Sequence, residues 1–202
     1  LRVSLNAERD NLAEQIFREG LDNGTIQFRL RADGKNWQMP HTELTNQPIV
    51  AHPLQNNMEP ITKSLFESVY QADFNPDEQN VALFLEREET IQWWHRNVAR
   101  RQYGIQGWRR NKMYPDFLFG IQRQDGAISS IRILETKGDQ LDNLDTAYKR
   151  SVMETLTEHF SFEAVTDVGQ CIIQDEEVSV DARLILFGEI AVELPNWINE
   201  AE

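Results

Sequence analysis

The chain contains 202 residues, of which 40% are hydrophobic and 26% charged, and its only cysteine is Cys171. A chain of this length and composition can bury a sizeable core, while a single cysteine excludes an internal disulfide and a cysteine-rich metal cluster. The formal net charge of −13 argues against a nucleic-acid partner unless basic residues are concentrated in one segment.

The N-terminal segment is predicted to begin with an amphipathic helix. Apolar residues recur at helical spacing between Leu5 and Leu21, and Ser4 can cap the first turn. Four of the first ten residues are charged, and no apolar run in the sequence approaches the length of a bilayer span. We therefore expect no signal peptide, no membrane segment and a cytoplasmic location.

A strand, a turn and a second helix are expected next. Residues 25–31 alternate between apolar and polar side chains, and Asp33-Gly34 indicates a hairpin turn into another strand. Residues 40–59 have the composition of a loop, and residues 60–70 can form a short helix that is opened by its proline. We place a domain boundary near Phe74, so that residues 1–74 form an accessory N-terminal α/β segment.

Residues 75–202 are predicted to form the main domain. Its first helix has a clear start signal, since Asn75 can cap, Pro76 suits the first helical position and Glu78 completes a capping box. The further expected elements are strands at 91–98, 114–123 and 128–137, a helix at 141–160, and strands near 169–174 and 182–188. This order predicts a mixed α/β fold, with a central mixed sheet flanked by helices.

Basic residues are concentrated in the middle of the chain. No acidic residue occurs between Glu89 and Asp116, whereas the last third, from Asp139 onward, has 15 acidic residues against three basic ones. The candidates for contact with nucleic-acid phosphates are Arg96, Arg100, Arg101, Arg109, Arg110 and Lys112. Tyr103 and Trp108 lie among them and can stack on bases, although a solvated surface loop would have the same composition.

The strands at 114–123 and 128–137 bring acidic residues together. If Asp125 and Gly126 form a two-residue turn, paired residues have numbers that sum to 251, so Asp116 and Glu135 lie opposite one another. Alternation along the strand places Lys137 on the same face as Glu135. Both strands are otherwise apolar on both faces, which is an unfavourable place for charges that have no role.

Two neighbouring carboxylates repel each other, and they are tolerated if one stays protonated or if a cation lies between them. Because the candidate ligands are oxygen atoms of Asp116, Glu135 and the Thr136 carbonyl, the pattern favours Mg²⁺ or Mn²⁺ over Zn²⁺. Lys137 can orient a water or neutralise developing charge, which together implies hydrolysis of a phosphodiester bond. An exposed hairpin end with a Glu–Lys ion pair is the structural alternative.

A family resemblance rests on several strings of the sequence. They are Phe74-Asn75 with Glu78, Trp93-Trp94-His95-Arg96-Asn97, Tyr114-Pro115-Asp116-Phe117 and Leu134-Glu135-Thr136-Lys137-Gly138. Together they resemble the PD-(D/E)XK nuclease superfamily, and in particular the C-terminal endonuclease region of type III restriction enzyme Res subunits and related helicase–nuclease fusions. The resemblance covers about residues 74–160.

The resemblance implies a restriction-endonuclease-like core and Mg²⁺-dependent cleavage of double-stranded DNA. It implies that Asp116 and Glu135 are metal ligands, that Lys137 is catalytic and that Glu78 joins the site, although a helix cap explains Glu78 equally well. It also implies a helicase motor and a methyltransferase subunit as partners, since no G-x-x-x-x-G-K-[ST] motif occurs in this sequence. Two rival functions are a non-catalytic DNA-binding or assembly module and a metal-dependent hydrolase of another substrate.

Overall fold

A four-stranded mixed sheet forms the centre of the protein. The computed structural model describes residues 2–26, 28, 54–56, 58–65, 69–138, 144–160 and 178–200. The strands are β3 (Ile91–Arg96), β4 (Phe117–Gln122), β5 (Ile128–Lys137) and β6 (Ser179–Leu186), which lie side by side in that order. The first three are antiparallel, and β6 runs parallel to β5.

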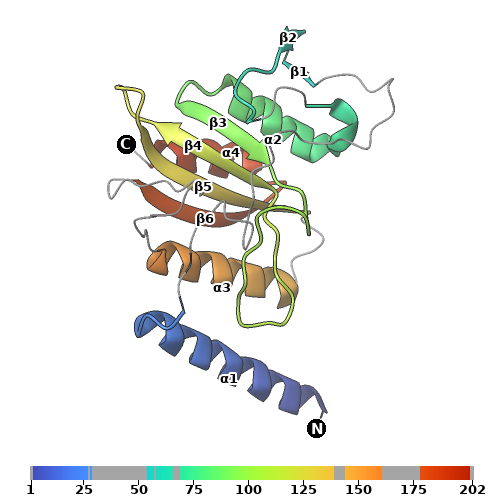
Figure 1. Cartoon of the computed structure of the whole chain (residues 1–202). Helices are drawn as coiled ribbons and strands as arrows, with labels where there is room; N and C mark the ends of the chain where they lie inside the picture. The colour runs from blue at the N-terminus through green and yellow to red at the C-terminus, as the bar shows by residue number, and fades with distance from the viewer. Residues whose placement is uncertain are drawn as a thin grey trace.

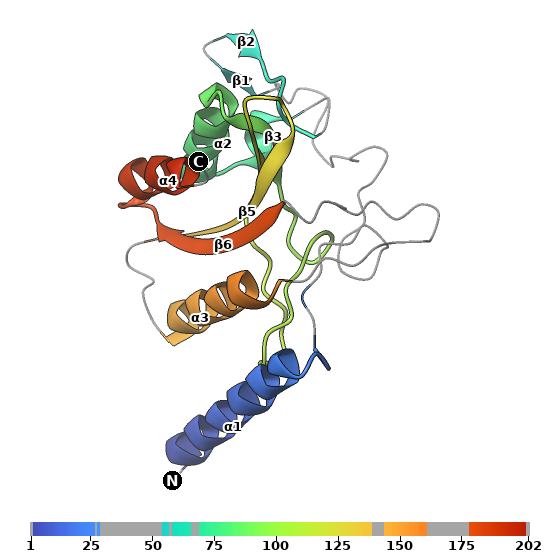
Figure 2. The ribbon, with the colours of Figure 1, turned by 90° about the vertical axis from the view of Figure 1, so that its left-hand side faces the viewer.

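Helices cover both faces of this sheet (Figures 1 and 2). Helices α2 (Pro76–Arg87) and α4 (Ile190–Asn199) lie on one face, and α3 (Leu144–His159), which connects β5 to β6, lies on the other. Helix α1 (Arg2–Asp22) lies outside α3. The predicted mixed α/β fold, with a mixed sheet flanked by helices, is therefore confirmed.

The two central strands bury side chains on both faces, as their apolar sequences predict. Leu118 and Ile133 belong to the hydrophobic cluster between the sheet and α3. Phe119 and Leu134, one residue along each strand, belong to the cluster under α2 and α4. Successive side chains of a strand point to opposite faces, so any charged residue on β4 or β5 must enter one of these two layers.

The start of α2 is the one that the sequence predicts. The Asn75 side chain accepts hydrogen bonds from the backbone N–H groups of Asp77 (3.0 Å) and Glu78 (2.9 Å). The Glu78 carboxylate accepts one from the Asn75 N–H (3.0 Å), which completes the capping box.

Strands β4 and β5 pair in the predicted register. Partners from Phe117–Leu134 to Ile121–Ser130 have residue numbers that sum to 251. The ladder stops at Phe117, so Asp116 lies one residue outside β4 and is not itself a ladder partner of Glu135. The register prediction is confirmed for the strands, and the position of Asp116 has to be described from its own contacts.

The predicted two-residue turn is wrong. Arg123 N–H donates to the Ala127 carbonyl (2.8 Å), which leaves a three-residue loop, 124–126, with Gly126 at a φ of 83°. A left-handed glycine is typical of the last position of such a loop. A register shift next to Ile121 leaves Ser129 as an extra residue, and this bulge restores the pairing that a two-residue turn would have produced.

The helix predicted over residues 60–70 is also wrong. Pro60 lies in the short strand β2 (Glu59–Pro60), which pairs with β1 (Gln55–Asn56), and a 3₁₀ turn follows at Gln71–Asp73. Residues 63–65 follow the outer edge of β3, where the Trp94 N–H donates to the Lys63 carbonyl (2.9 Å) and the Trp94 carbonyl accepts from the Leu65 N–H (3.0 Å). The unpaired backbone groups of an edge strand thus determine the local conformation here.

Several predicted elements lie wholly or partly outside the described residues. They are the hairpin at 33–39, the strand near 169–174 with Cys171, and most of the loop at 40–59. Of the strand predicted at 25–31, only Thr25, Ile26 and Phe28 are described, and Phe28 forms a parallel bridge with Phe160.

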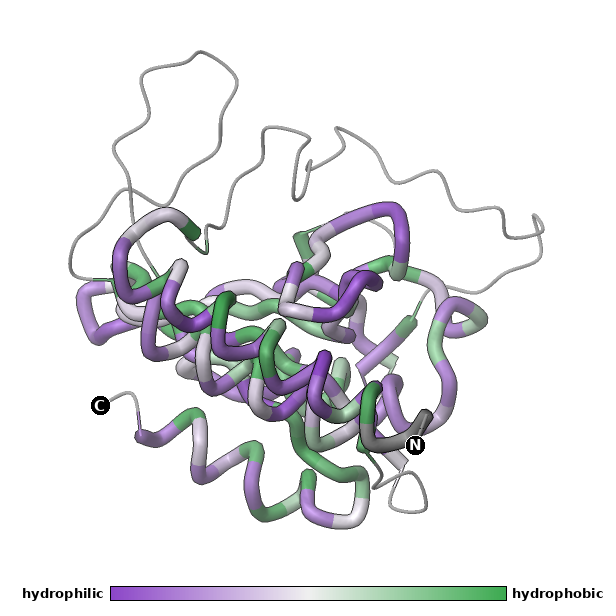
Figure 3. The backbone as a smooth tube through the Cα atoms, turned by 90° about the horizontal axis from the view of Figure 1, so that it is seen from below, coloured by the Kyte–Doolittle hydropathy of each residue, from purple (hydrophilic) through white to green (hydrophobic). Residues whose placement is uncertain are grey.

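The N-terminal helix packs on the main domain. It begins at Arg2, before the predicted cap at Ser4, and its Phe17 and Leu21 are buried in the same cluster as Val152 of α3. Seen from below in Figure 3, α1 alternates between hydrophilic and hydrophobic residues, as a helix on the outside of a fold does. The boundary near Phe74 stays a prediction. Within the described ranges, no helix is long and apolar enough to cross a membrane.

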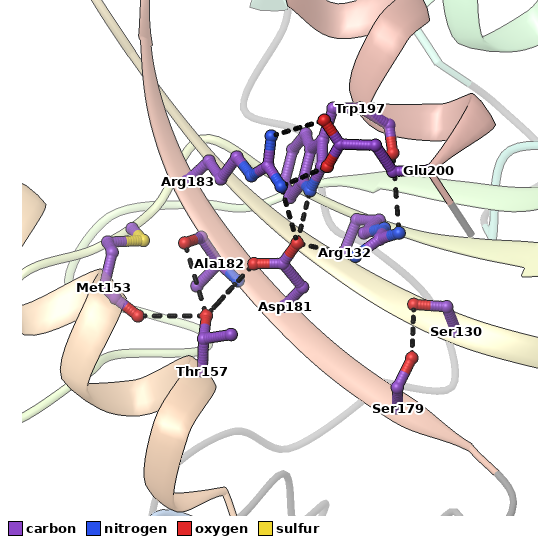
Figure 4. A network of polar contacts seen from close by, with 10 residues as sticks. All are labelled: Ser130, Arg132, Met153, Thr157, Ser179, Asp181, Ala182, Arg183, Trp197 and Glu200. Carbon is purple, nitrogen blue, oxygen red and sulfur yellow. Dashed lines mark hydrogen bonds and ion pairs between the residues drawn. The ribbon is translucent and has the colours of Figure 1, made fainter.

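Helix α4 was not predicted, although Ile190, Leu194, Trp197 and Ile198 have helical spacing. A polar network attaches it to the sheet (Figure 4). Asp181 of β6 accepts hydrogen bonds from Arg132 of β5 (2.7 Å) and from the Trp197 indole N–H of α4 (2.5 Å). This contact joins residues from three elements, so sequence spacing alone cannot predict it.

We expect Gly120→Ala to destabilise the protein by about 1–3 kcal/mol, the usual cost of overpacking a core. Gly120 pairs with Trp93 across β3 and β4, and a Cβ atom at residue 120 would come within 2.4 Å of the Trp93 indole nitrogen. Urea unfolding measures the loss. In a Trp93→Leu background the same substitution should cost much less, and an equal cost in both backgrounds would contradict this steric explanation.

Candidate active site

Asp116 directly precedes β4, and hydrogen bonds from Asn97 hold its backbone in place. Asn97, which follows β3, donates its backbone N–H to the Asp116 carbonyl (2.8 Å). Its buried side-chain amide donates to the carbonyls of Pro115 (2.8 Å) and Tyr103 (2.8 Å). Asn97 therefore links the Pro115-Asp116 peptide to Tyr103, in the middle of the basic segment (residues 96–112), which gives the Trp93–Asn97 string a structural role.

Beyond the end of the β4–β5 ladder, the Asp116 carboxylate, and not a backbone carbonyl, accepts the next hydrogen bond from β5. Asp116 N–H donates to the Leu134 carbonyl (2.9 Å), and its Oδ2 accepts from the Thr136 N–H (2.8 Å) and the Thr136 hydroxyl (2.5 Å). Burial raises the pKa of Asp116, the two Thr136 hydrogen bonds oppose this, and the charge of Glu78 adds to the increase. Oδ2 of Asp116 therefore has a structural role, since it binds Thr136 of β5.

Glu135 is a buried carboxylate with incomplete hydrogen bonding. Only 4% of the residue is exposed, and its Oε1 contacts the ammonium group of Lys149 on α3. Its Oε2 is buried and has no hydrogen-bond partner. Burial and then the neighbouring charge of Asp116 raise the pKa of Glu135 to about 7, against the opposing effects of Lys149 and Lys137.

Glu86 of α2 shows what a structural carboxylate in this protein looks like. It is 5% exposed, as deeply buried as Glu135. Its oxygens accept hydrogen bonds from the Thr62 N–H (2.7 Å), the Thr62 hydroxyl (2.9 Å) and the Trp94 indole (2.8 Å). A buried carboxylate is usually satisfied in this way, so the unpartnered oxygen of Glu135 calls for an explanation.

Thr136 and Lys137 complete the end of β5. The Leu134 carbonyl and the Thr136 N–H both point toward Asp116. Backbone groups two residues apart point to the same side of a strand, so the Thr136 carbonyl is directed there too. The half-buried Lys137 lies close enough to Glu135 to lower its pKa, as its predicted place on the same face requires.

The contacts of Glu78 are with Asn75 and Arg96 and not with the carboxylate pair, Asp116 and Glu135. It caps α2 and forms an ion pair with Arg96 (3.2 Å). Arg96 in turn lies over the Phe74 ring, at 5.3 Å from its centroid. The contacts explain both charged residues as a structural pair, although the charge of Glu78 still reaches Asp116 and raises its pKa.

Lys149 is a site residue that the sequence did not predict. Its position on the long amphipathic helix gave a weak signal, because Tyr148 and Val152 mark the buried face and Lys149 lies at its margin. Burial lowers the pKa of Lys149 but the Glu135 carboxylate raises it, and the net change is an increase. The ammonium group is therefore a permanent positive charge at the carboxylate pair.

An open pocket of about 1310 Å³, which we call the cationic pocket, is lined by Lys149, the partner of Glu135, but not by Asp116 or Glu135 themselves. Its walls come from α1, the basic segment and the start of α3. Its charged lining residues are Arg9, Arg100, Arg109, Arg110, Lys112 and Lys149, against Asp10 and Asp145. Six cations against two acids produce a positive surface on a chain whose net charge is −13.

The predicted phosphate contacts differ in their surroundings. Arg100, Arg110 and Lys112 are exposed and line the pocket, and Arg101 is exposed but does not line it. Arg109 lies over the Tyr148 ring at 4.2 Å and forms long ion pairs, both 3.7 Å, with Asp10 and Asp145. Arg96 and Arg109 are thus committed to contacts within the protein.

The proposed stacking residues are engaged in packing. Tyr103 is 2% exposed, which excludes it from base stacking in this structure. Trp108 packs edge-on against Tyr148 (4.9 Å between ring centroids) and against Phe17 of α1 (5.8 Å). Trp108 and the half-buried Tyr114 are the aromatic residues of this segment that line the pocket.

Asp116, Glu135 and Thr136 suit a magnesium ion that keeps some of its waters better than they suit a metal ion that is coordinated by protein atoms alone. Within the described part of the chain, no three or more His, Cys, Asp and Glu side chains form a group that could hold a metal ion. Mg²⁺, however, usually keeps several waters and is bound by one or two carboxylates together with substrate phosphates. Asp116, the unpartnered Glu135 oxygen and the Thr136 carbonyl provide such a partial set.

Comparisons with known protein families, with curated proteins and with solved structures found no match to this chain.

Proposed function

We propose that this chain holds a divalent-metal-dependent DNA endonuclease domain of the PD-(D/E)XK type. The single observation that carries the proposal is the unpartnered, buried oxygen of Glu135 near Asp116, on a carboxylate whose ion-pair partner Lys149 lines the cationic pocket. Neighbouring carboxylates of which one is buried cost stability, and the Lys149 ammonium contacts only one oxygen of Glu135, which leaves the other oxygen for a metal ion.

The residues of this chain divide the work in the proposed site. Asp116, Glu135 and the Thr136 carbonyl would hold Mg²⁺ or Mn²⁺, which when bound supplies a Lewis acid for the phosphodiester and lowers the pKa of a water. Lys137 would orient that water or neutralise developing charge, and Glu78 would act through its charge on Asp116. Arg100, Arg110 and Lys112 would contact phosphates of double-stranded DNA, which fixes the position of the duplex but reads no sequence.

The fold agrees with this proposal at the level of its elements. The hairpin that carries Asp116 and Glu135 follows helix α2 and precedes helix α3, within a mixed sheet flanked by helices. A restriction-endonuclease-like core, and partners comprising a helicase motor and a methyltransferase subunit, are the finer parts of the proposal.

Incubation with supercoiled plasmid tests the activity. We expect nicked or linear DNA in Mg²⁺ or Mn²⁺ and intact plasmid in EDTA. DNA binding without cleavage in either metal would favour the non-catalytic module. Absence of both binding and cleavage would favour a hydrolase of another substrate.

The double substitution Arg110→Ala/Lys112→Ala is expected to weaken DNA binding about tenfold or more. It should also reduce the slope of log K against log salt concentration by about two, one for each lost phosphate contact. Both residues line the cationic pocket. Fluorescence anisotropy across a salt series measures both quantities. Arg101→Ala removes an exposed cation that does not line the pocket, so it should have a smaller effect, and equal losses would contradict the assignment of the pocket.

A further inference from the structure

Lys149 contacts Glu135 and also lines the cationic pocket, so it connects the carboxylates of Asp116 and Glu135 to that pocket. Its ammonium contacts Glu135 Oε1, while its side chain also lines the pocket beside Arg110 and Lys112. The exposed fraction of the Lys149 side chain is 20%, against 5% for Glu135. One end of the ion pair is therefore fixed on a central strand, and the other is a flexible side chain at the margin of solvent.

The ion pair leaves Glu135 incompletely satisfied. The second oxygen of Glu135 has no partner, and the neighbouring carboxylate of Asp116 already uses one oxygen for Thr136. The contrast with Glu86, whose oxygens accept hydrogen bonds from fixed donors, shows that Lys149 does not complete a structural site. An ammonium and a divalent cation on one carboxylate would repel each other, so the two compete for Glu135.

We propose, on the premise of the proposed function, that Lys149 is an exchangeable counter-ion of Glu135. Without a divalent cation, the Lys149 ammonium stays on Glu135. When Glu135 binds a divalent cation, the Lys149 ammonium turns to a DNA phosphate in the cationic pocket. Binding of the cation and binding of DNA then strengthen each other through one side chain, as linkage requires of any coupled pair of sites.

Equilibrium binding of a short DNA duplex, in EDTA and in saturating Ca²⁺, tests this coupling, with a gel to verify that the duplex stays intact. Lys149→Met should lose much less affinity, relative to the wild type, in EDTA than in Ca²⁺. It should bind about tenfold more weakly than the wild type in Ca²⁺, because one charge-assisted contact is lost only there. Arg150→Met removes the neighbouring cation of the same helix and should have the same effect under both conditions.

A Lys149→Met protein that retains the full tightening by Ca²⁺ would overturn the inference. A second measurement uses the wild type itself, in case that variant does not fold. With lysine labelled at ¹³Cε, the Lys149 signal, identified by its loss in Lys149→Arg, should shift on addition of Ca²⁺ without DNA. An unmoved signal at saturating Ca²⁺ would also overturn the inference.

Calorimetry separates this inference from the function on which it rests. If the wild type binds neither Ca²⁺ nor Mg²⁺, the proposed metal site is wrong and the inference falls with it. If the wild type binds the cation but the coupling is the same in Lys149→Met, only the role of Lys149 is overturned.

Discussion

Replacing Glu135 by glutamine is expected to lower the rate of DNA cleavage by about a thousandfold or more, equivalent to roughly 4 kcal/mol of transition-state stabilisation. The same change should leave the protein at least as stable as the wild type at pH 8. Glutamine is nearly isosteric, so the packing around β5 is kept, whereas the charge needed to bind a divalent cation is removed. Plasmid cleavage and urea unfolding measure the two effects.

The stability part of this prediction depends on pH. The pKa of Glu135 is raised to about 7 in the folded protein, so the folded state disfavours the ionised carboxylate relative to the unfolded chain. Ionisation between about pH 4.5 and 7 therefore lowers the stability of the wild type as pH rises. Glu135→Gln lacks this loss, and its advantage over the wild type should be larger at pH 8 than at pH 5.

Glu86→Gln is the matched control, because Glu86 is buried to the same extent but fully hydrogen-bonded. An amide group there would place a donor against the donors of Thr62 or Trp94, at a cost of about 1–3 kcal/mol. We expect this variant to be less stable and, where folded, to cleave DNA normally. Cleavage by Glu135→Gln at the wild-type rate would contradict the assignment of the active site.

Asp181→Ala is expected to destabilise the protein by about 3–5 kcal/mol, because it leaves the buried Arg132 guanidinium without its counter-ion. The Arg132 side chain is 6% exposed and the Asp181 side chain 16%. Asp181 also accepts hydrogen bonds from the Trp197 indole (2.5 Å) and the Thr157 hydroxyl (3.1 Å), so its loss loosens both α4 and α3 (Figure 4). Thermal unfolding should show a decrease in Tm of about 10 °C.

A second substitution distinguishes an unpaired charge from a general packing defect. Arg132→Met removes the stranded cation, so the double variant Arg132→Met/Asp181→Ala should recover much of the lost stability. Glu200→Ala removes the exposed partner of Arg183 in the same network and should cost less than about 1 kcal/mol. A loss of less than about 1 kcal/mol in Asp181→Ala would show that Arg132 does not depend on this contact.

Short-range patterns predicted the elements that carry the candidate site. The capping box at Asn75 and Glu78 and the hairpin of β4 and β5 depend on residues that are near in sequence, and both occur as expected. The hairpin is instructive, since an incorrect turn and an unexpected bulge at Ser129 cancel, and the alternation of two buried strands preserves the predicted register.

The partners of the charged residues were decided by the tertiary structure. Lys149 reaches Glu135, and Asp10 reaches Arg109, only because α3 packs on the sheet and α1 packs outside α3. Residues 63–65, predicted to be helical, pair with the edge of β3 instead, and the Asp181 network attaches helix α4, which was not predicted. The sequence by itself determined the strands of the central sheet, the register of β4 and β5 and the carboxylates at the end of that hairpin, because these follow from local periodicity. Which cation faces each carboxylate was determined only by packing, since that depends on distances between elements remote along the chain.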